Sequence, residues 1–315
     1  MNKTRIAVLN GGDSAEASVS RSSARGVVKA LKENYESVTS IELDTKIANS
    51  LADCKPDIVF PILHGPPGED GTLQGFLEIL GYQYVGSDVH SSAFAMDKIV
   101  AKEVFRSANL PVARQCVVTR DQGLADAVAQ ITESLGDQVV VKPACQGSAI
   151  GITLINNANQ LHDAVTAAFE FDHRLLVEER IDGKEITVGV IDTDKGTEPF
   201  PVIEITTPED SWYDFDHRYT EGWSEHIMPA ELRDSQSTAL QEIAVAAHQA
   251  LGCRDLSRAD FIVTDTDIVL LEVNTLPGMT PTSLYPDGAR GYGLDFPELV
   301  RYLVERAVGR GASVV

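Results

Sequence analysis

The chain has 315 residues, of which 43% are hydrophobic and 23% charged, as is typical of a soluble globular protein of two or three domains. Its formal net charge of -21 argues against nucleic acids and acidic membranes as partners, because both attract basic surfaces. The four separated cysteines form no CxxC pair, and we see no signal-peptide core or membrane-spanning run, so we expect a protein of the reducing cytoplasm.

The first predicted element is a buried strand at Arg5 to Leu9, followed by a glycine turn and a helical segment from Ser14 to Leu31. This order begins an α/β unit, but the turn lacks the GxGxxG of a dinucleotide site. Glu16 stands near the start of the helix, at the edge of an open α/β sheet where ligands bind. Its carboxylate could hold a substrate ammonium group or simply complement the helix dipole.

A second apolar strand, Ile58 to Leu63, ends at His64 and is followed by the loop Gly65 to Gly71 and a helical pattern over Thr72 to Leu80. A lone histidine is more often structural than functional, but its place at a strand end makes His64 a candidate for supporting a site.

A further helix is predicted from Lys98 to Ala108, because the pattern stops before Leu110-Pro111. Lys98 and Lys102 share one face of this helix. One of them could reach a phosphate group, or both could be ordinary solvated lysines.

A small-residue loop, Pro143 to Gly151, lies between a predicted strand at Gln138 to Lys142 and another at Thr153 to Ile155. It is no Walker A loop, yet a glycine-rich loop with exposed amides beside Lys142 suits closure over nucleotide phosphates. Two more strands, Arg174 to Val177 and Lys184 to Ile191, are joined by a segment whose backbone could bind adenine, with Glu185 accepting from ribose.

The segment Ser257 to Ser283 predicts a β-hairpin, with strands at Ala259 to Val263 and Ile268 to Val273. Arg258 and Asp260 share one face of the first strand, and Glu272 and Asn274 share one face of the second. If Asp260 lies opposite Glu272, the four polar groups meet, and their oxygens suit Mg²⁺. The alternative is a surface hairpin with solvated charges.

Read together, five segments resemble the ordered motifs of the D-alanine:D-alanine ligases of the ATP-grasp superfamily: HGPPGEDGTLQGFLE, MDK, VVKPACQGSAIG, GCRDLSRADF and LLEVNTLPGMTPTSL. The resemblance extends from Glu16 to Leu284. It implies an α/β, three-domain ATP-grasp fold: a Rossmann-like N-terminal substrate-binding domain (1–96), a central ATP-grasp subdomain (97–182) and a C-terminal catalytic domain with an ω-loop (183–315). It also implies a cytoplasmic homodimer that joins two D-alanines through an acylphosphate, using ATP, in peptidoglycan precursor synthesis.

The resemblance further implies roles for individual residues. Asp260, Glu272 and Asn274 would bind two Mg²⁺ ions, which Mn²⁺ can replace. The ATP-binding residues would be Lys98, Lys142, Glu178, Arg180, Ile181, Glu185 and Arg218. The catalytic group would comprise Glu16, which anchors the first substrate's ammonium, Ser148, which links Glu16 to the ω-loop Tyr219, and Arg258 with the Gly278 backbone, which face the oxyanion. His64, Ser283 and Leu284 would bind substrate.

Three departures from the family pattern leave the second substrate open, and a protein of another class is a separate alternative. Arg218 replaces the usual lysine, Ala149 a common serine and Ala17 a usually polar residue, so the second substrate could be D-lactate, D-serine or another amino acid. Tyr219 favours D-alanyl-D-alanine, but His226 follows it closely and leaves the choice undecided. The other alternative, a nucleotide-binding protein without ligase activity, has no need for an oxyanion-facing arginine.

Overall fold

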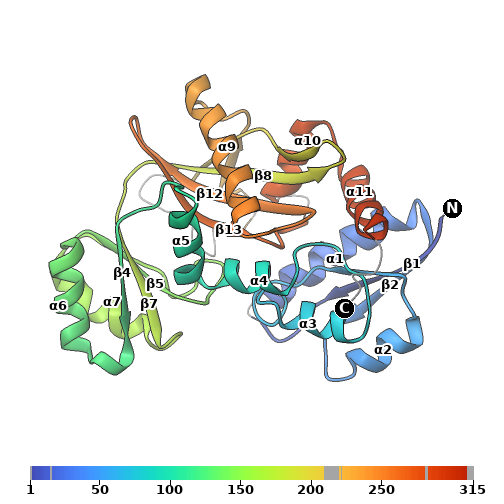
Figure 1. Cartoon of the computed structure of the whole chain (residues 1–315), viewed down its shortest axis with the longest axis horizontal. Coiled ribbons are helices and arrows are strands. Elements are labelled where there is room, and N and C mark those ends of the chain that lie inside the picture. Colours follow the sequence, from blue (N-terminus) through green and yellow to red (C-terminus); the bar gives the residue numbers. More distant parts are fainter. Residues whose placement is uncertain (1, 15, 209–219, 221, 281–282, 311–315) are drawn as a thin grey trace.

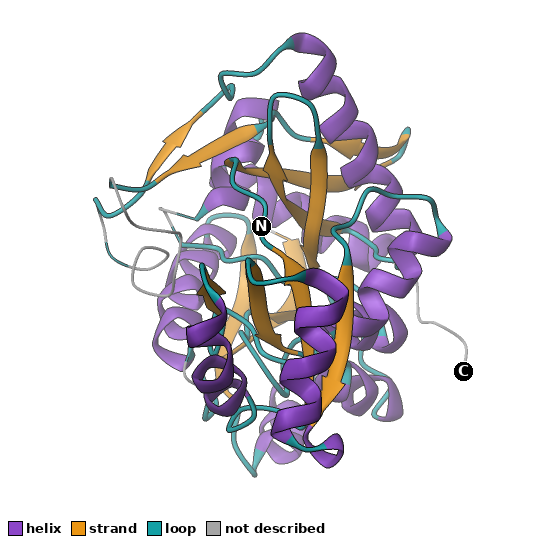
Figure 2. Ribbon diagram, turned by 90° about the vertical axis from the view of Figure 1, so that its left-hand side faces the viewer, coloured by secondary structure: helices purple, strands orange, loops and turns teal. Residues whose placement is uncertain are grey.

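The computed structural model describes residues 2–14, 16–208, 220, 222–280 and 283–310, which form three β-sheets with helices packed against them. Figure 1 shows the first sheet at one end of the molecule, the second at the opposite end and the third between them. Figure 2 shows helices flanking the strands. This arrangement confirms the predicted three-part α/β fold. Arg218 and Tyr219 lie outside the described residues.

The first sheet is parallel, with the strand order β2-β1-β3. It contains β1 (Asn2–Asn10), β2 (Tyr35–Glu42) and β3 (Ile58–Pro61), with helices α1 (Ala17–Lys32), α2 (Ile47–Cys54), α3 (Thr72–Ile79) and α4 (Val89–Met96). The middle strand is buried from Ile6 to Asn10, because a parallel sheet is covered on both faces. After it, Gly11 takes a positive φ, and a side chain there would collide with the Glu42 carboxylate. Helix α1 begins at Ala17, later than the predicted start at Ser14.

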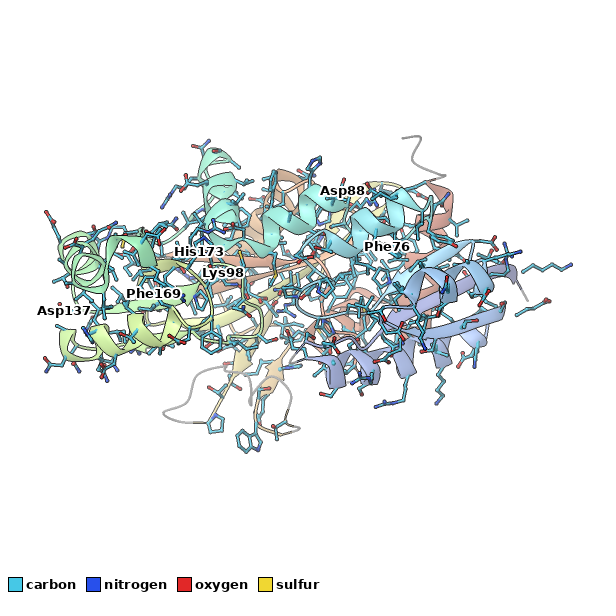
Figure 3. The ribbon with its side chains drawn as sticks, turned by 90° about the horizontal axis from the view of Figure 1, so that it is seen from below. Phe76, Asp88, Lys98, Asp137, Phe169 and His173 are labelled. Carbon is cyan, nitrogen blue, oxygen red and sulfur yellow. The ribbon has the colours of Figure 1, made fainter. Side chains whose placement is uncertain are left out.

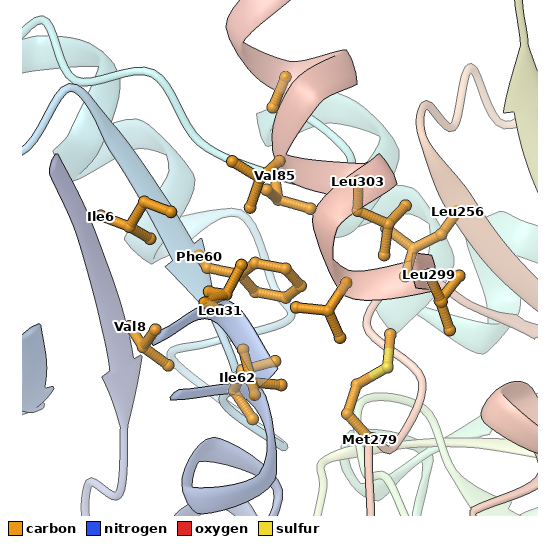
Figure 4. Packing of buried hydrophobic residues seen from close by; sticks show 14 of the residues in the cluster. Ile6, Val8, Leu31, Phe60, Ile62, Val85, Leu256, Met279, Leu299 and Leu303 are labelled. Atoms are coloured by element: carbon orange, nitrogen blue, oxygen red, sulfur yellow. The ribbon is translucent and has the colours of Figure 1, made fainter. Parts of the chain in front are cut away.

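The last helix of the chain completes the core of this first unit. Helix α10 (Leu284–Tyr292) leads to α11 (Phe296–Gly309), which starts with a capping box between Asp295 and Glu298. Leu299 and Leu303 of α11 belong to the same buried cluster as Val8 and Phe60 of the first sheet (Figure 4). Although α11 falls in the predicted C-terminal domain, it packs with the first sheet.

The second sheet is antiparallel, with the strand order β4-β7-β5-β6. Its strands are β4 (Gln115–Thr119), β5 (Val139–Pro143), β6 (Thr153–Ile155) and β7 (Arg174–Glu179), and α6 (Leu124–Leu135) and α7 (Leu161–Ala168) pack against it. Strand β7 is longer than predicted, because Glu178 pairs with Gln115 and the Glu179 N–H donates to Arg114 O at 2.9 Å. Glu178 is therefore a strand residue rather than part of a connecting segment.

The third sheet has the order β11-β10-β8-β12-β13, with β9 paired to β8. Its strands are β8 (Lys184–Thr193), β9 (Gly196–Pro199), β10 (Ile203–Thr206), β11 (Glu225–Ile227), β12 (Leu256–Val263) and β13 (Ile268–Asn274). Helices α5 (Lys98–Ser107) and α9 (Asp234–Ala250) share a buried cluster with it, to which Phe105 and Leu240 contribute. In the described part of the chain, every helix is too short or too polar to cross a membrane.

Candidate active site

The predicted hairpin is present as β12 and β13, and it brings the expected polar groups together. Asp260 lies opposite Glu272, and Arg258 lies opposite Asn274. Arg258 donates to both carboxylate oxygens of Asp260, at 2.8 and 2.7 Å, and Asn274 Nδ2 donates to the same carboxylate at 3.0 Å. A further hydrogen bond comes from Thr187 Oγ1 on β8 at 2.6 Å. Because Arg258 is 8% exposed, the alternative of a solvated surface hairpin is wrong.

The donor set fits a hard cation such as Mg²⁺. Asn274 donates to Asp260 through its amide nitrogen, a contact that does not use its carbonyl oxygen, and oxygen donors are what Mg²⁺ prefers. Within the described ranges there is no group of three or more His, Cys, Asp or Glu side chains suited to a metal. Two carboxylates and an amide would leave coordination positions for phosphate oxygens and water, as is usual for Mg²⁺.

Lys98 and Lys102 are both buried, so the interpretation of ordinary solvated lysines is wrong for each. Lys98 Nζ lies 3.4 Å from Glu272 Oε2 and donates to Gln146 O at 2.7 Å. The second contact joins α5 to the small-residue loop after β5. Figure 3 shows Lys98 between Asp137 and Phe169 of the second unit and Phe76 and Asp88 of the first.

A cavity opens between the second and third sheets and contains most of the predicted ATP-binding residues. Lys142, Glu178, Arg180, Ile181 and Glu185 line it. Sequence reasoning missed its apolar walls, which include Val140, Ile152, Leu154, Ile262, Val269 and Leu271. The sequence of β5 contains a signal for this wall. Val139 and Val141 point into the core, so Val140 between them points to the other face of the sheet, where its apolar side chain lines the cavity.

Glu178 is the most strongly perturbed acid of this cavity. Its carboxylate contacts the ammonium groups of Lys142 and Lys102, the latter at 2.6 Å. Burial alone would raise the pKa of Glu178, but the two lysines overcome this effect and lower it to about 2. Glu178 is therefore an ionised carboxylate held in the cavity wall.

A second cavity lies where the three units meet and collects the predicted substrate and catalytic residues. The described residues that line it include Glu16, His64, Lys98, Ser148, Arg258, Glu272, Asn274, Gly278, Ser283 and Leu284. Glu272 lines both cavities. The two spaces therefore meet at the hairpin carboxylate that is predicted to bind metal.

The loop after β5 reaches the first unit through Ser148, whose hydroxyl donates to Glu16 Oε1. Ser148, Ala149 and Gly151 have positive φ angles of 48°, 60° and 74°. Left-handed backbone is unfavourable for the first two residues and is typical of functional loops. The predicted contact between Glu16 and Ser148 is confirmed; the predicted third partner, Tyr219, lies outside the described residues.

His64 is buried beside two carboxylates. Burial opposes the charged form, but Glu69, whose Oε1 lies 4.0 Å from His64 Nδ1, and Glu16 raise the pKa of His64 above its ordinary value. Its Nε2 has no hydrogen-bond partner among the described residues. Glu69 was missed as a site residue, although it belongs to the HGPPGED motif, and it also accepts from the Gly65 N–H at 2.6 Å.

Gly278 lies close to Ser283, so that a Cβ atom at position 278 would approach Ser283 Oγ to 2.8 Å. Ser283 Oγ in turn accepts from the Thr280 N–H at 3.0 Å. A side chain at Gly278 would displace this hydroxyl, which explains why glycine is needed beside a predicted substrate ligand.

Comparisons with known proteins agree with this geometry. The sequence model described as "D-ala D-ala ligase C-terminus" matches residues 104–305, and "D-ala D-ala ligase N-terminus" matches residues 39–87. A D-alanine–D-alanine ligase of Halalkalibacterium halodurans is 44% identical, over 95% of this chain and 98% of its own length. A D-alanine–D-alanine ligase of Methylobacterium radiotolerans is 42% identical, over 96% of this chain and 97% of its own length.

Solved structures show the same architecture. A D-alanine–D-alanine ligase from Bacillus anthracis complexed with ATP has a TM-score of 0.83 and 29% identity, and the match covers 98% of each chain. The VanG D-Ala:D-Ser ligase from Enterococcus faecalis has a TM-score of 0.82 and 32% identity, with 97% of this chain and 100% of that chain covered.

Proposed function

The chain belongs to the D-alanine–D-alanine ligase family, and we propose from this premise that it joins two D-alanine molecules into D-alanyl-D-alanine, with conversion of ATP to ADP and phosphate, for peptidoglycan precursor synthesis. The observation that carries the proposal is the meeting of two cavities at Glu272. Transfer of a phosphoryl group from ATP to an amino acid requires the nucleotide and the acceptor to meet at such a junction.

ATP would occupy the cavity between the second and third sheets, with adenine against the apolar wall and the backbone at Ile181, and ribose at Glu185. The phosphates would extend toward Lys142 and Lys98. Asp260, Glu272 and Asn274 would hold Mg²⁺, which neutralises charge on the transferring phosphoryl group when it is bound. The support for this arrangement is that the hairpin supplies oxygen donors at the point where both cavities meet.

The first D-alanine would bind with its ammonium group at Glu16 and its carboxylate toward His64. A carboxylate oxygen attacks the γ-phosphorus, the bond to ADP breaks, and an acylphosphate forms. The amine of the second D-alanine, after losing a proton, attacks the acyl carbon, and phosphate leaves as the peptide bond forms. Arg258 and the Gly278 N–H would donate to the oxyanion of the tetrahedral intermediate.

The second substrate has a specific competitor, D-serine, because the VanG D-Ala:D-Ser ligase is among the similar structures. His226 gives little support to D-lactate: its Nδ1 pairs with Asp287 Oδ2 of α10 at 2.7 Å, which is a structural role for the ring. We therefore keep D-alanine as the second substrate and D-serine as the alternative.

We also propose a cytoplasmic homodimer. Ile79 and Leu80 at the end of α3 and Phe94 on α4 expose 87%, 43% and 41% of their surfaces, and an acidic chain can associate with a copy of itself more readily through uncharged surface. Light scattering after gel filtration tests this proposal. The mass of a monomer at micromolar concentration would reject the dimer, and the proposed ligase reaction would not be affected by that result.

The test of the reaction is ADP release with D-alanine, D-serine and D-lactate, followed by mass spectrometry of the products. We expect D-alanyl-D-alanine as the main product at neutral pH. If D-alanyl-D-serine is the main product, the second substrate is D-serine and not D-alanine. If the chain binds ATP but releases no ADP with any of these acids, it is a nucleotide-binding protein and not a ligase.

A further inference from the structure

Lys102 is a lysine whose side chain is almost completely removed from solvent, with 1% of its surface exposed. It stands on α5 one helical turn after Lys98, but it is not among the residues that line either cavity. Removing an ammonium group from water costs several kcal/mol unless the group is paired. The proposed reaction gives Lys102 no task, so its burial calls for a separate explanation.

The Lys102 ammonium group joins three elements. Nζ lies 2.6 Å from Glu178 Oε1 on β7 and donates to Leu270 O on β13 at 2.8 Å. The Leu270 N–H donates to Pro111 O at 2.8 Å, so the stretch from α5 to Pro111 engages both backbone groups of Leu270 on an edge strand of the third sheet. Residues of β7 and β13 both line the nucleotide cavity. Lys102 lies outside the cavity lining and contacts both strands, β7 through Glu178 and β13 through Leu270.

The charges around Glu178 show what this contact does. Its carboxylate, 2% exposed, has Lys102 on one oxygen and Lys142 on the other. Two cations and one anion leave a net charge of about +1, and Lys142 is the cation that faces the cavity. Without Lys102, Glu178 would neutralise Lys142 alone, and Lys142 would attract an anionic ligand less strongly. Burial lowers the pKa of Lys102, although Glu178 acts in the opposite direction.

We propose that Lys102 is a positioning residue of the nucleotide site: it holds and neutralises Glu178 behind the cavity wall, so that the positive charge of Lys142 remains available to the phosphates. This inference rests on the proposed function, because it takes the cavity to be the ATP site. A positioning role through charge has a specific signature. Loss of Lys102 should weaken ligands in proportion to their phosphate charge and should spare an uncharged nucleoside.

The experiment is isothermal titration of the full chain with adenosine, ADP and ATP in the presence of Mg²⁺. For Lys102→Met we expect ADP and ATP to bind about tenfold more weakly or worse, with adenosine nearly unchanged, because the lost charge acts on the phosphates only through Glu178 and Lys142. Lys184→Met is the matched control. Its Nζ also pairs with a glutamate, Glu204 at 2.8 Å, and a carbonyl, Glu231 O at 3.1 Å, but it lies outside the nucleotide cavity.

A second variant restores the charge balance. Lys102→Met combined with Glu178→Gln again gives the cluster of positions 102, 142 and 178 a net charge of about +1, so the ratio of ADP to adenosine affinity should return toward that of the unmodified chain. The ratio is the correct readout because Glu178 is itself a predicted adenosine ligand. Where circular dichroism shows that Lys102→Met does not fold, Lys102→Arg, which keeps the charge, and the double variant carry the test.

An unchanged ADP to adenosine ratio in folded Lys102→Met overturns the inference, and so does a phosphate-dependent loss in the folded double variant. Either result leaves the proposed ligase standing, provided that the unmodified chain binds ATP and forms product. If the unmodified chain binds no ATP, the proposed function itself fails, together with the role of Lys102.

Discussion

Replacement of Arg258 by alanine tests the catalytic hairpin most directly. The change removes two hydrogen bonds to Asp260, at 2.8 and 2.7 Å, from a side chain that is 10% exposed. Asp260 still accepts hydrogen bonds from Thr187 and Asn274, so its carboxylate retains two donors. Breaking a buried ion pair typically costs 3–5 kcal/mol, and with two donors retained we expect about 3 kcal/mol of lost stability.

The effect on catalysis should be separate from this loss. If Arg258 donates to the oxyanion, its removal lowers turnover by roughly 10²–10³-fold, because one such donor contributes about 3–4 kcal/mol. Turnover is measured by ADP release at saturating substrates, at a temperature where urea denaturation shows that the variant is fully folded. Under these conditions, unfolding of the variant cannot account for a lower turnover rate.

The matched control is Arg5→Ala. Arg5 also pairs with Asp57 through two hydrogen bonds, at 3.2 and 2.6 Å, but at the solvent-exposed start of β1. Exposed pairs of this kind contribute little, so neither the urea midpoint nor turnover should change measurably. If Arg258→Ala raises only the Michaelis constants while turnover stays normal, Arg258 binds the ground state and the oxyanion assignment is wrong.

Three further outcomes follow from the site. Glu272→Gln should lower turnover by about a hundredfold or more, by weakening charge neutralisation at the transferring phosphoryl group; near-normal turnover at saturating Mg²⁺ would reject the metal assignment. His64 is charged below its raised pKa, so the Michaelis constant for D-alanine should increase as pH rises through that pKa; a profile that is the same in His64→Gln contradicts this. His226→Ala, which breaks the pair with Asp287, should leave the ratio of dipeptide to depsipeptide product unchanged between about pH 6 and 8; a preference for D-alanyl-D-lactate at pH 6 that vanishes in the variant would place the ring in the substrate pocket.

Local patterns were sufficient to predict the hairpin. Alternation of apolar and polar residues defines which side chains share a face, but the turn alone does not set the pairing of Asp260 with Glu272. The register shifts at a bulge between Asp260 and Phe261, and only this shift places the two carboxylates opposite each other. The contact between Glu16 and Ser148 came from the family resemblance, since the two residues belong to different units.

Long-range burial could not be predicted in this way. Lys102 shares a helix face with Lys98, which is visible in the sequence, but its acceptor on Leu270 is 168 residues away. Nothing local distinguishes such a lysine from a solvated one.

The packing of α11 with the first sheet has a consequence for how the chain is made. A ribosome synthesises the chain from the N-terminal side, so β1, α1 and β3 emerge well before α11, the helix that shares a buried cluster with Val8 and Phe60. Until then the apolar side chains of the first unit lack part of their cover, and such surfaces favour aggregation or binding by chaperones. We expect the first unit to reach its native packing only after α11 has emerged, and a chain truncated before Phe296 to lose the order of its first unit.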